Sequence, residues 1–275
     1  MPTVNLHKSY NVPLAKAFEY ANKFGGKFSE EYKFTGVDTV IATSIVTSAL
    51  TDYDRTLAAG RYGTTSEVDD STQIMQLQKD RSFSKAVDKG NYIEQNYLKT
   101  GAAITKAFMD EQVGPEVETF ILSQLGANAG TSISKTNAPT ASTIIALLTD
   151  IEVAMDDARV PVTERYVALP HAHIGLLRQS LLQCNDITDK MLLKGIVGQF
   201  GSLHVIGVPA ASMPTKTDAI AWQKSCAIAP KTIDDVKVSH DVPGISGMLV
   251  EGRFRYGAFV ITKRAKGVVK AVHTA

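Results

Sequence analysis

The sequence predicts an α+β protein, and three observations support this class. A run rich in β-branched residues near residue 40 favours a strand, apolar residues after residue 91 recur at helical spacing, and strand and helix patterns alternate after residue 140. The chain has 275 residues, 44% of them hydrophobic and 21% charged, so it can bury one large core or two smaller ones. These values exclude a chain that is disordered as a whole.

The first 90 residues are predicted to be extended. The segment 39–47 is rich in Thr, Val and Ile, and a polar stretch punctuated by Gly60 and Gly63 follows it. Residues 64–89 contain only short apolar runs between charged residues, so they cannot form a core of their own. We expect an arm and a long projecting hairpin, which is marginally stable alone and needs support from another surface, often another copy of the chain.

A long helix is predicted from about Asn91, because its apolar residues recur three or four positions apart. These residues are Ile93, Tyr97, Ile104, Phe108, Val117, Phe120, Ile121 and Leu125. Pro115 lies inside this pattern and removes a backbone donor, so we expect a kink or a break there. Gly126 is expected to end the second part of the helix.

Strands and helices alternate in the rest of the chain. A second helix is predicted from Ile144 to Ala158 and is stopped by Val160-Pro161. The predicted elements that follow are a buried strand at 166–169, a short helix from Pro170 through Leu181, a turn at 198–201, a strand at 203–208, and strands between 247 and 272 broken at Gly257 and Gly267.

Charge and composition exclude several classes of protein. The formal net charge is +1, so no global field attracts nucleic acid, although residues 252–275 carry six basic side chains and no acidic one. This basic stretch could touch phosphates; the alternatives are a strand edge kept soluble by Lys and Arg, or a set of contacts to acidic neighbours. No apolar run approaches the roughly 20 residues that span a bilayer, and the first residues lack the apolar stretch of a signal peptide, so we expect a cytoplasmic protein without a membrane span. Cys184 and Cys226 are expected to be buried thiols.

The sequence shows no motif for catalysis or metal binding. His171 and His173 invite a metal interpretation, but two ligands are insufficient and no evident third lies nearby. The adjacent aspartate pairs point in different directions on a helix or a strand, and the nucleophile-elbow, phosphate-loop and dinucleotide-binding glycine patterns are all missing. We therefore expect no catalytic residue, no cofactor and no metal, while a soluble α/β enzyme that uses His171 or His173 stays open as an alternative.

Seven stretches, taken in order, resemble the major capsid proteins of tailed bacteriophages with the Hong Kong 97-type fold. Two resemble the return of that family's extended loop, one its proline-containing spine region, and four its later helix and strands. The stretches are Thr72–Leu77, Asp80–Asp88, Met109–Glu118, Met155–Pro161, Arg165–Pro170, Lys194–Gly201 and Val205–Pro209. The resemblance covers roughly residues 35 to 265.

The resemblance implies a division of the chain into five parts. These are an N-terminal arm (1–38), a strand and extended loop (39–90), a spine helix with the peripheral domain (91–139), an axial domain (140–235), and C-terminal strands that return to the peripheral domain (236–275). It implies a structural coat protein, not an enzyme, that assembles as pentamers and hexamers into the icosahedral head of a phage virion in the host cytoplasm. The head would enclose double-stranded DNA without reading its sequence, with a separate scaffolding protein and a portal as further partners.

Five charged residues of the loop region are candidates for contacts between subunits: Arg55, Arg61, Asp69, Asp70 and Arg81. Exposed ion pairs contribute only about 0 to 1 kcal/mol each, so strength would come from many repeated contacts. A second alternative on the same fold is the shell of an encapsulin-like nanocompartment, which encloses cargo enzymes in place of DNA and needs a defined pocket for a cargo peptide.

Overall fold

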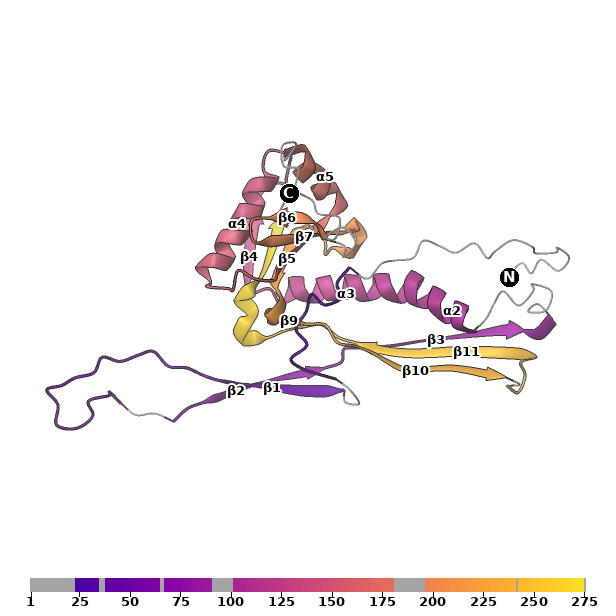
Figure 1. Cartoon of the computed structure of the whole chain (residues 1–275), viewed down its shortest axis with the longest axis horizontal. Coiled ribbons are helices and arrows are strands. Elements are labelled where there is room, and N and C mark those ends of the chain that lie inside the picture. Colours follow the sequence, from indigo (N-terminus) through magenta and orange to yellow (C-terminus); the bar gives the residue numbers. More distant parts are fainter. Residues whose placement is uncertain are drawn as a thin grey trace.

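The computed structural model describes residues 23–34, 38–64, 67–90, 101–180, 196–240 and 242–274. It has an α+β architecture with three separate parts: a roughly triangular domain, a long helix beside a long three-stranded sheet, and a two-stranded ribbon that projects away from both (Figure 1). The expected α+β class is confirmed.

The triangular domain is built on a mixed six-stranded sheet in the order β4-β13-β8-β5-β7-β6. The pairs β4/β13 and β5/β7 are parallel, and the other three pairs are antiparallel. The strands are β4 (Thr131–Lys135), β5 (Arg165–Pro170), β6 (Ile196–Phe200), β7 (Leu203–Val208), β8 (Thr217–Gln223) and β13 (Val268–His273). Strands from outside residues 140–235 thus complete this sheet, while the five-part division itself stays a proposal about domains.

Each face of this sheet is covered by a different set of elements. Helices α4 (Ile144–Asp157) and α5 (His171–Ser180) pack on one face with Val167 and Leu169 of β5. Helix α3 (Gly114–Ala127) and the segment 23–28 pack on the other face with Tyr166 and Ala168. This alternation follows from the period of two along a strand and explains why all of β5 is buried.

The three-stranded sheet is antiparallel, in the order β10-β11-β3. Its strands are β3 (Lys79–Asp88), β10 (Lys231–His240) and β11 (Gly247–Tyr256). Helix α2 (Gly101–Phe108), a π-helical turn (Met109–Val113) and α3 run beside it (Figure 1). Val113 packs with Phe254 and Tyr256, so the apolar side of this helix is fixed against the sheet.

The expected break at Pro115 takes the form of a π-helical turn. Pro115 lies in the first turn of α3, directly after the π turn, where its missing N–H costs least. The helix continues through the distortion and ends at Ala127, one residue beyond the predicted Gly126. Residues 91–100, where the helix was predicted to begin, lie outside the described residues.

One local prediction was wrong. The segment 198–201 was expected to be a turn, but β6 extends to Phe200 and pairs with β7 as far as Phe200↔Leu203. The reversal is made by Gly201, whose φ of +52° is a left-handed conformation that glycine adopts without strain.

The remaining short elements connect these parts. In the described residues they are β1 (Thr39–Ile45), β2 (Asp70–Gln76), β9 (Ala227–Ile228), β12 (Phe259–Val260) and three 3₁₀ turns (Ala210–Ser212, Lys224–Cys226 and Thr262–Gly267), the last of which leads into β13. The predicted breaks at Gly257 and Gly267 agree with the ends of β11 and of the turn before β13. Leu181 and Cys184 lie outside the described residues, and Cys226 is buried as expected.

Candidate functional site

The projecting ribbon consists of β1 and β2, which pair antiparallel from Thr39↔Gln76 to Ile45↔Asp70 (Figure 1). Its inner face is anchored to the body of the protein. Ala42 and Met75 are buried in a cluster with Phe34 and Phe259, and the Gln73 side chain bonds to the backbone of the segment 260–262. The base of the ribbon is therefore held firmly by its own chain.

The outer face of the ribbon carries three uncovered isoleucines among threonine, glutamine and aspartate side chains. Ile41 and Ile74 are direct cross-strand partners and are 59% and 69% exposed, and Ile45 lies on the same side. An isolated two-stranded ribbon is only marginally stable in water, and within the described chain this one is supported on its inner face alone. Contiguous exposed apolar surface of this kind marks an interaction site.

The loop at the far end of the ribbon, residues 46–69, continues this apolar surface. Leu50 is fully exposed, and Tyr53 and Tyr62 contact each other edge to face with ring centroids 4.9 Å apart. Thr51 Oγ1 donates to the Tyr62 carbonyl at 3.0 Å, so the loop has local order. None of its described residues belongs to a buried cluster, and its large side chains have no core to enter.

Four of the five predicted contact residues are exposed and carry no ion pair within the described part of the chain. Arg55, Asp69 and Asp70 extend from the loop and the start of β2, and Arg61 donates only to the Leu57 carbonyl. The structure does not join these arginines to these aspartates. Their role between subunits stays a proposal.

Arg81, the fifth, has a partner inside the chain. Its Nε lies 2.7 Å from Glu116 Oε1, and the Tyr256 hydroxyl donates to the same oxygen at 2.7 Å. Burial, and then the bond to Glu116, raise the pKa of Tyr256 to about 12, so this hydroxyl keeps its proton at neutral pH. The three residues tie β3, α3 and β11 together.

The three arginines of the basic C-terminal stretch are paired with acidic residues of the same chain. Arg253 pairs with Asp80, Arg255 with Asp38, and Arg264 with Glu31. The contact to acidic neighbours, one of the two interpretations of this stretch, is therefore the one that the geometry favours. The neutralised arginines leave less free charge for phosphate groups.

The two histidines have different environments. His171 Nε2 lies 3.4 Å from Lys23 Nζ, and burial together with that cation lowers the pKa of His171. His173 Nδ1 lies 3.1 Å from the backbone carbonyl oxygen of Asp218, and the Asp218 carboxylate accepts a hydrogen bond from His273 Nδ1 at 2.9 Å. Among the described residues, no three His, Cys, Asp or Glu side chains are arranged to hold a metal ion.

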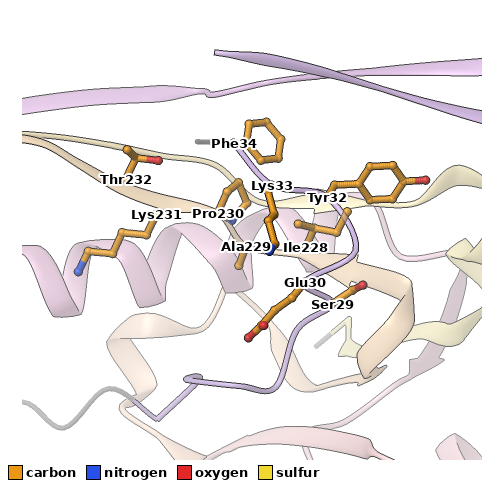
Figure 2. Close-up of a pocket in the computed structure, with 10 residues that line it drawn as sticks. All are labelled: Ser29, Glu30, Tyr32, Lys33, Phe34, Ile228, Ala229, Pro230, Lys231 and Thr232. Carbon is orange, nitrogen blue, oxygen red and sulfur yellow. The ribbon is translucent and has the colours of Figure 1, made fainter. Parts of the chain in front are cut away.

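A cavity of about 460 Å³ lies between residues 29–34 and the β9–β10 junction. Figure 2 shows Phe34 and Tyr32 on one side of it, and Pro230 and Lys231 on the strand side. Burial lowers the pKa of Lys231. The lining mixes apolar and charged groups.

No family model and no curated protein matches the sequence. Solved structures do match the structure of the chain. A chain from Mycobacterium phage Che8 has a TM-score of 0.76 at 20% identity over 98% of each chain. The capsid structure of cyanophage P-SCSP1u has a TM-score of 0.74 at 11% identity, over 98% of this chain and 93% of that one. The mature capsid of bacteriophage PhiM1 has a TM-score of 0.67 at 13% identity, over 100% and 97%.

The chain has the Hong Kong 97-type fold. The resemblance predicted from seven sequence stretches is confirmed at the level of fold, over nearly the whole chain. In this Hong Kong 97-type chain, no helix of the described segments is long and apolar enough to cross a membrane.

Sequence reasoning missed two buried groups of this Hong Kong 97-type chain. Glu118 is 3% exposed, neither carboxylate oxygen has a hydrogen-bond partner among the described residues, and burial raises its pKa to about 7. Its position three residues before Ile121 and seven before Leu125 was a usable signal of burial. Asp218 carried no such signal, because its partners His173 and His273 are 45 and 55 residues away.

Proposed function

We propose that this protein is the major coat protein of a tailed phage, a structural protein that assembles in many copies into a closed shell. The observation that carries the proposal is the uncovered apolar face of the ribbon and its loop, from Ile41 and Ile74 to Leu50. The fold shared with capsid structures of other phages supports it. A subunit that projects such a surface beyond its own core forms a complete structure only against another copy.

From the resemblance to phage capsid proteins we infer the finer arrangement, which is pentamers and hexamers on an icosahedral lattice, assembled in the host cytoplasm. Contacts between different surfaces of identical subunits form such rings when the rotation between neighbours closes. The neutralised C-terminal arginines are consistent with a shell that encloses double-stranded DNA without gripping it. A separate scaffolding protein and a portal complete the proposed set of partners.

The test is negative-stain electron microscopy together with size-exclusion chromatography, on the chain expressed alone and with a candidate scaffolding protein. Closed shells, or separate pentamers and hexamers, support the proposal. A monomer or dimer that never assembles in either condition overturns it and returns attention to an enzyme that uses His171 or His173. Shells that purify with a protein cargo and no nucleic acid support the nanocompartment alternative.

A pair of variants tests the observation that carries the proposal. Ile74→Glu places a charge on the outer face of the ribbon, where the side chain is 69% exposed. Val162→Glu makes the same change at a site that is 62% exposed, before β5 and away from the ribbon. We expect Ile74→Glu to fold but not to assemble, and Val162→Glu to assemble normally. If both variants assemble to the same extent, the outer face of the ribbon is not an assembly contact.

A further inference from the structure

A second cavity, of about 340 Å³, lies beside the loop between β4 and α4. Its walls are partly apolar, formed by Pro139, Ala146 and Leu147, and partly polar, formed by Asn137 and Thr140. Asp218, near the start of β8, also lines it.

Asp218 is 1% exposed, and its two carboxylate oxygens differ. Oδ1 lies 2.9 Å from His273 Nδ1 and 3.9 Å from His173 Nε2. Oδ2 has no hydrogen-bond partner among the described residues. A buried carboxylate oxygen without a donor is costly, so a ligand that supplies one gains binding free energy.

The charge around the cavity favours a cation. Lys135 also lines it, but its Nζ lies 2.6 Å from Asp150 Oδ2 and is already compensated. Asp218 is therefore the acidic group that lacks a donor on one oxygen. One carboxylate is too few for a calcium ion, which takes six to eight oxygen ligands.

An organic cation fits better than a metal ion. The apolar walls suit a short aliphatic stem, as the stems of lysine and arginine lie along apolar surfaces while their charged ends find polar partners. The volume leaves room for such a group, and Asn137 and Thr140 offer further acceptors.

We propose that this cavity binds a primary ammonium or guanidinium group on a short aliphatic stem, with the carboxylate of Asp218, which lines the cavity, as its charged partner. The group comes either from a free small amine or from a lysine or arginine of a second copy of the chain. The binding itself does not depend on the proposed coat function, and only the second source does.

The test uses 1,5-diaminopentane and n-butylguanidinium as probes and n-butylurea as the neutral control, measured by ligand-observed NMR and calorimetry on the purified full chain. We expect both cations to bind and the urea not to bind. Asp218→Asn is expected to weaken the cations about tenfold or more, because hydrogen bonds to charged groups exceed the 1.4 kcal/mol that corresponds to tenfold. Asp157→Asn, an exposed carboxylate at the end of α4, is the matched control and should change nothing.

Ala146→Leu provides a second variant if Asp218→Asn does not fold. Ala146 is exposed on α4 and lines the cavity, so leucine narrows the space without touching the carboxylate. Loss of cation binding in this variant supports the site. Equal binding of urea and guanidinium, binding that neither variant weakens, or no cation binding at millimolar concentration overturns it.

Assembled particles distinguish the two sources. If the cavity receives a side chain from a neighbouring copy, the probes bind free subunits and no longer bind shells. If the natural ligand is a free amine, the probes bind both. Failure to form shells would refute the coat function and leave the result on free subunits standing.

Discussion

Glu118→Gln should stabilise the subunit at neutral and alkaline pH and have little effect in acid. Glu118 lies on the face of α3 that holds Ile121 and Leu125, with both oxygens unpaired among the described residues. Burial raises its pKa from an ordinary value of 4.5 to about 7. The folded protein thus favours the neutral acid, whereas the unfolded chain lets it ionise.

The sign and size follow from this difference. Protonated Glu118 contributes to the free energy of unfolding relative to the ionised form. This contribution is fully present below about pH 4.5, falls as pH rises, and is lost once pH has passed through about 7. At about 1.4 kcal/mol per pKa unit, the loss amounts to as much as about 3 kcal/mol. Glutamine cannot ionise, so the advantage of the variant over the wild type should grow by up to that amount between pH 4.5 and 8.

The assay is guanidinium denaturation of dissociated subunits, followed by the fluorescence of Trp222. This is the only tryptophan of the chain, and it is buried against Phe24 and Phe28, so its emission reports unfolding of the core. Glu111→Gln, on the exposed side of the π turn, is the matched control. If the advantage of Glu118→Gln is the same at pH 4.5 and pH 8, or no larger than that of the control, the argument from burial fails.

Two further predictions use the same denaturation assay. Arg165 is fully buried, donates to the backbone carbonyls of Val160 and Pro161, and pairs with the exposed Asp156 at 2.7 Å. Arg165→Leu should cost about 2 kcal/mol or more, because it leaves these two carbonyls without their donor; a loss below about 1 kcal/mol would contradict this. Gly130→Ala should destabilise the fold, because the added Cβ would lie 2.4 Å from the backbone of Ala265. The Cβ added by Gly175→Ala in α5 has no atom within 4 Å, so this variant should stabilise the fold by about 0.5 to 1 kcal/mol. The opposite order of the two glycine variants would contradict the packing.

The fold was predictable where local pattern and tertiary structure agree. The β-branched run at 39–47 formed β1, and the spacing from Val117 to Leu125 formed α3, because both periods bury one face. The reversal at Gly201 was missed by a few residues, since a pattern of glycines does not fix which one takes the left-handed conformation. The π turn before Pro115 also lies beyond period arguments, which predict a distortion without its form.

Long-range pairing was not predictable from the sequence. The parallel pair β4 and β13 joins residues 131–135 to residues 269–273, and neither segment contains a pattern that indicates its partner strand. The pairing of β13 with β8, which are also far apart in the sequence, brings His273 to Asp218, so the buried carboxylate and its cavity followed from topology alone. Arg81 shows the converse, because its place in the predicted loop suggested a partner in another subunit, while the fold supplied Glu116 of the same chain.

The distribution of charge and apolar surface indicates what holds copies of this chain together. Arginines of the body find acidic partners within the chain: Arg81 with Glu116, Arg253 with Asp80, and Arg264 with Glu31. The apolar side chains of the ribbon and its loop find no such cover. Burial of apolar area is worth about 25 cal/mol per Å², whereas exposed ion pairs contribute about 0 to 1 kcal/mol each. We therefore expect the ribbon to supply most of the binding free energy between copies, and the free charges of its loop to set register and specificity.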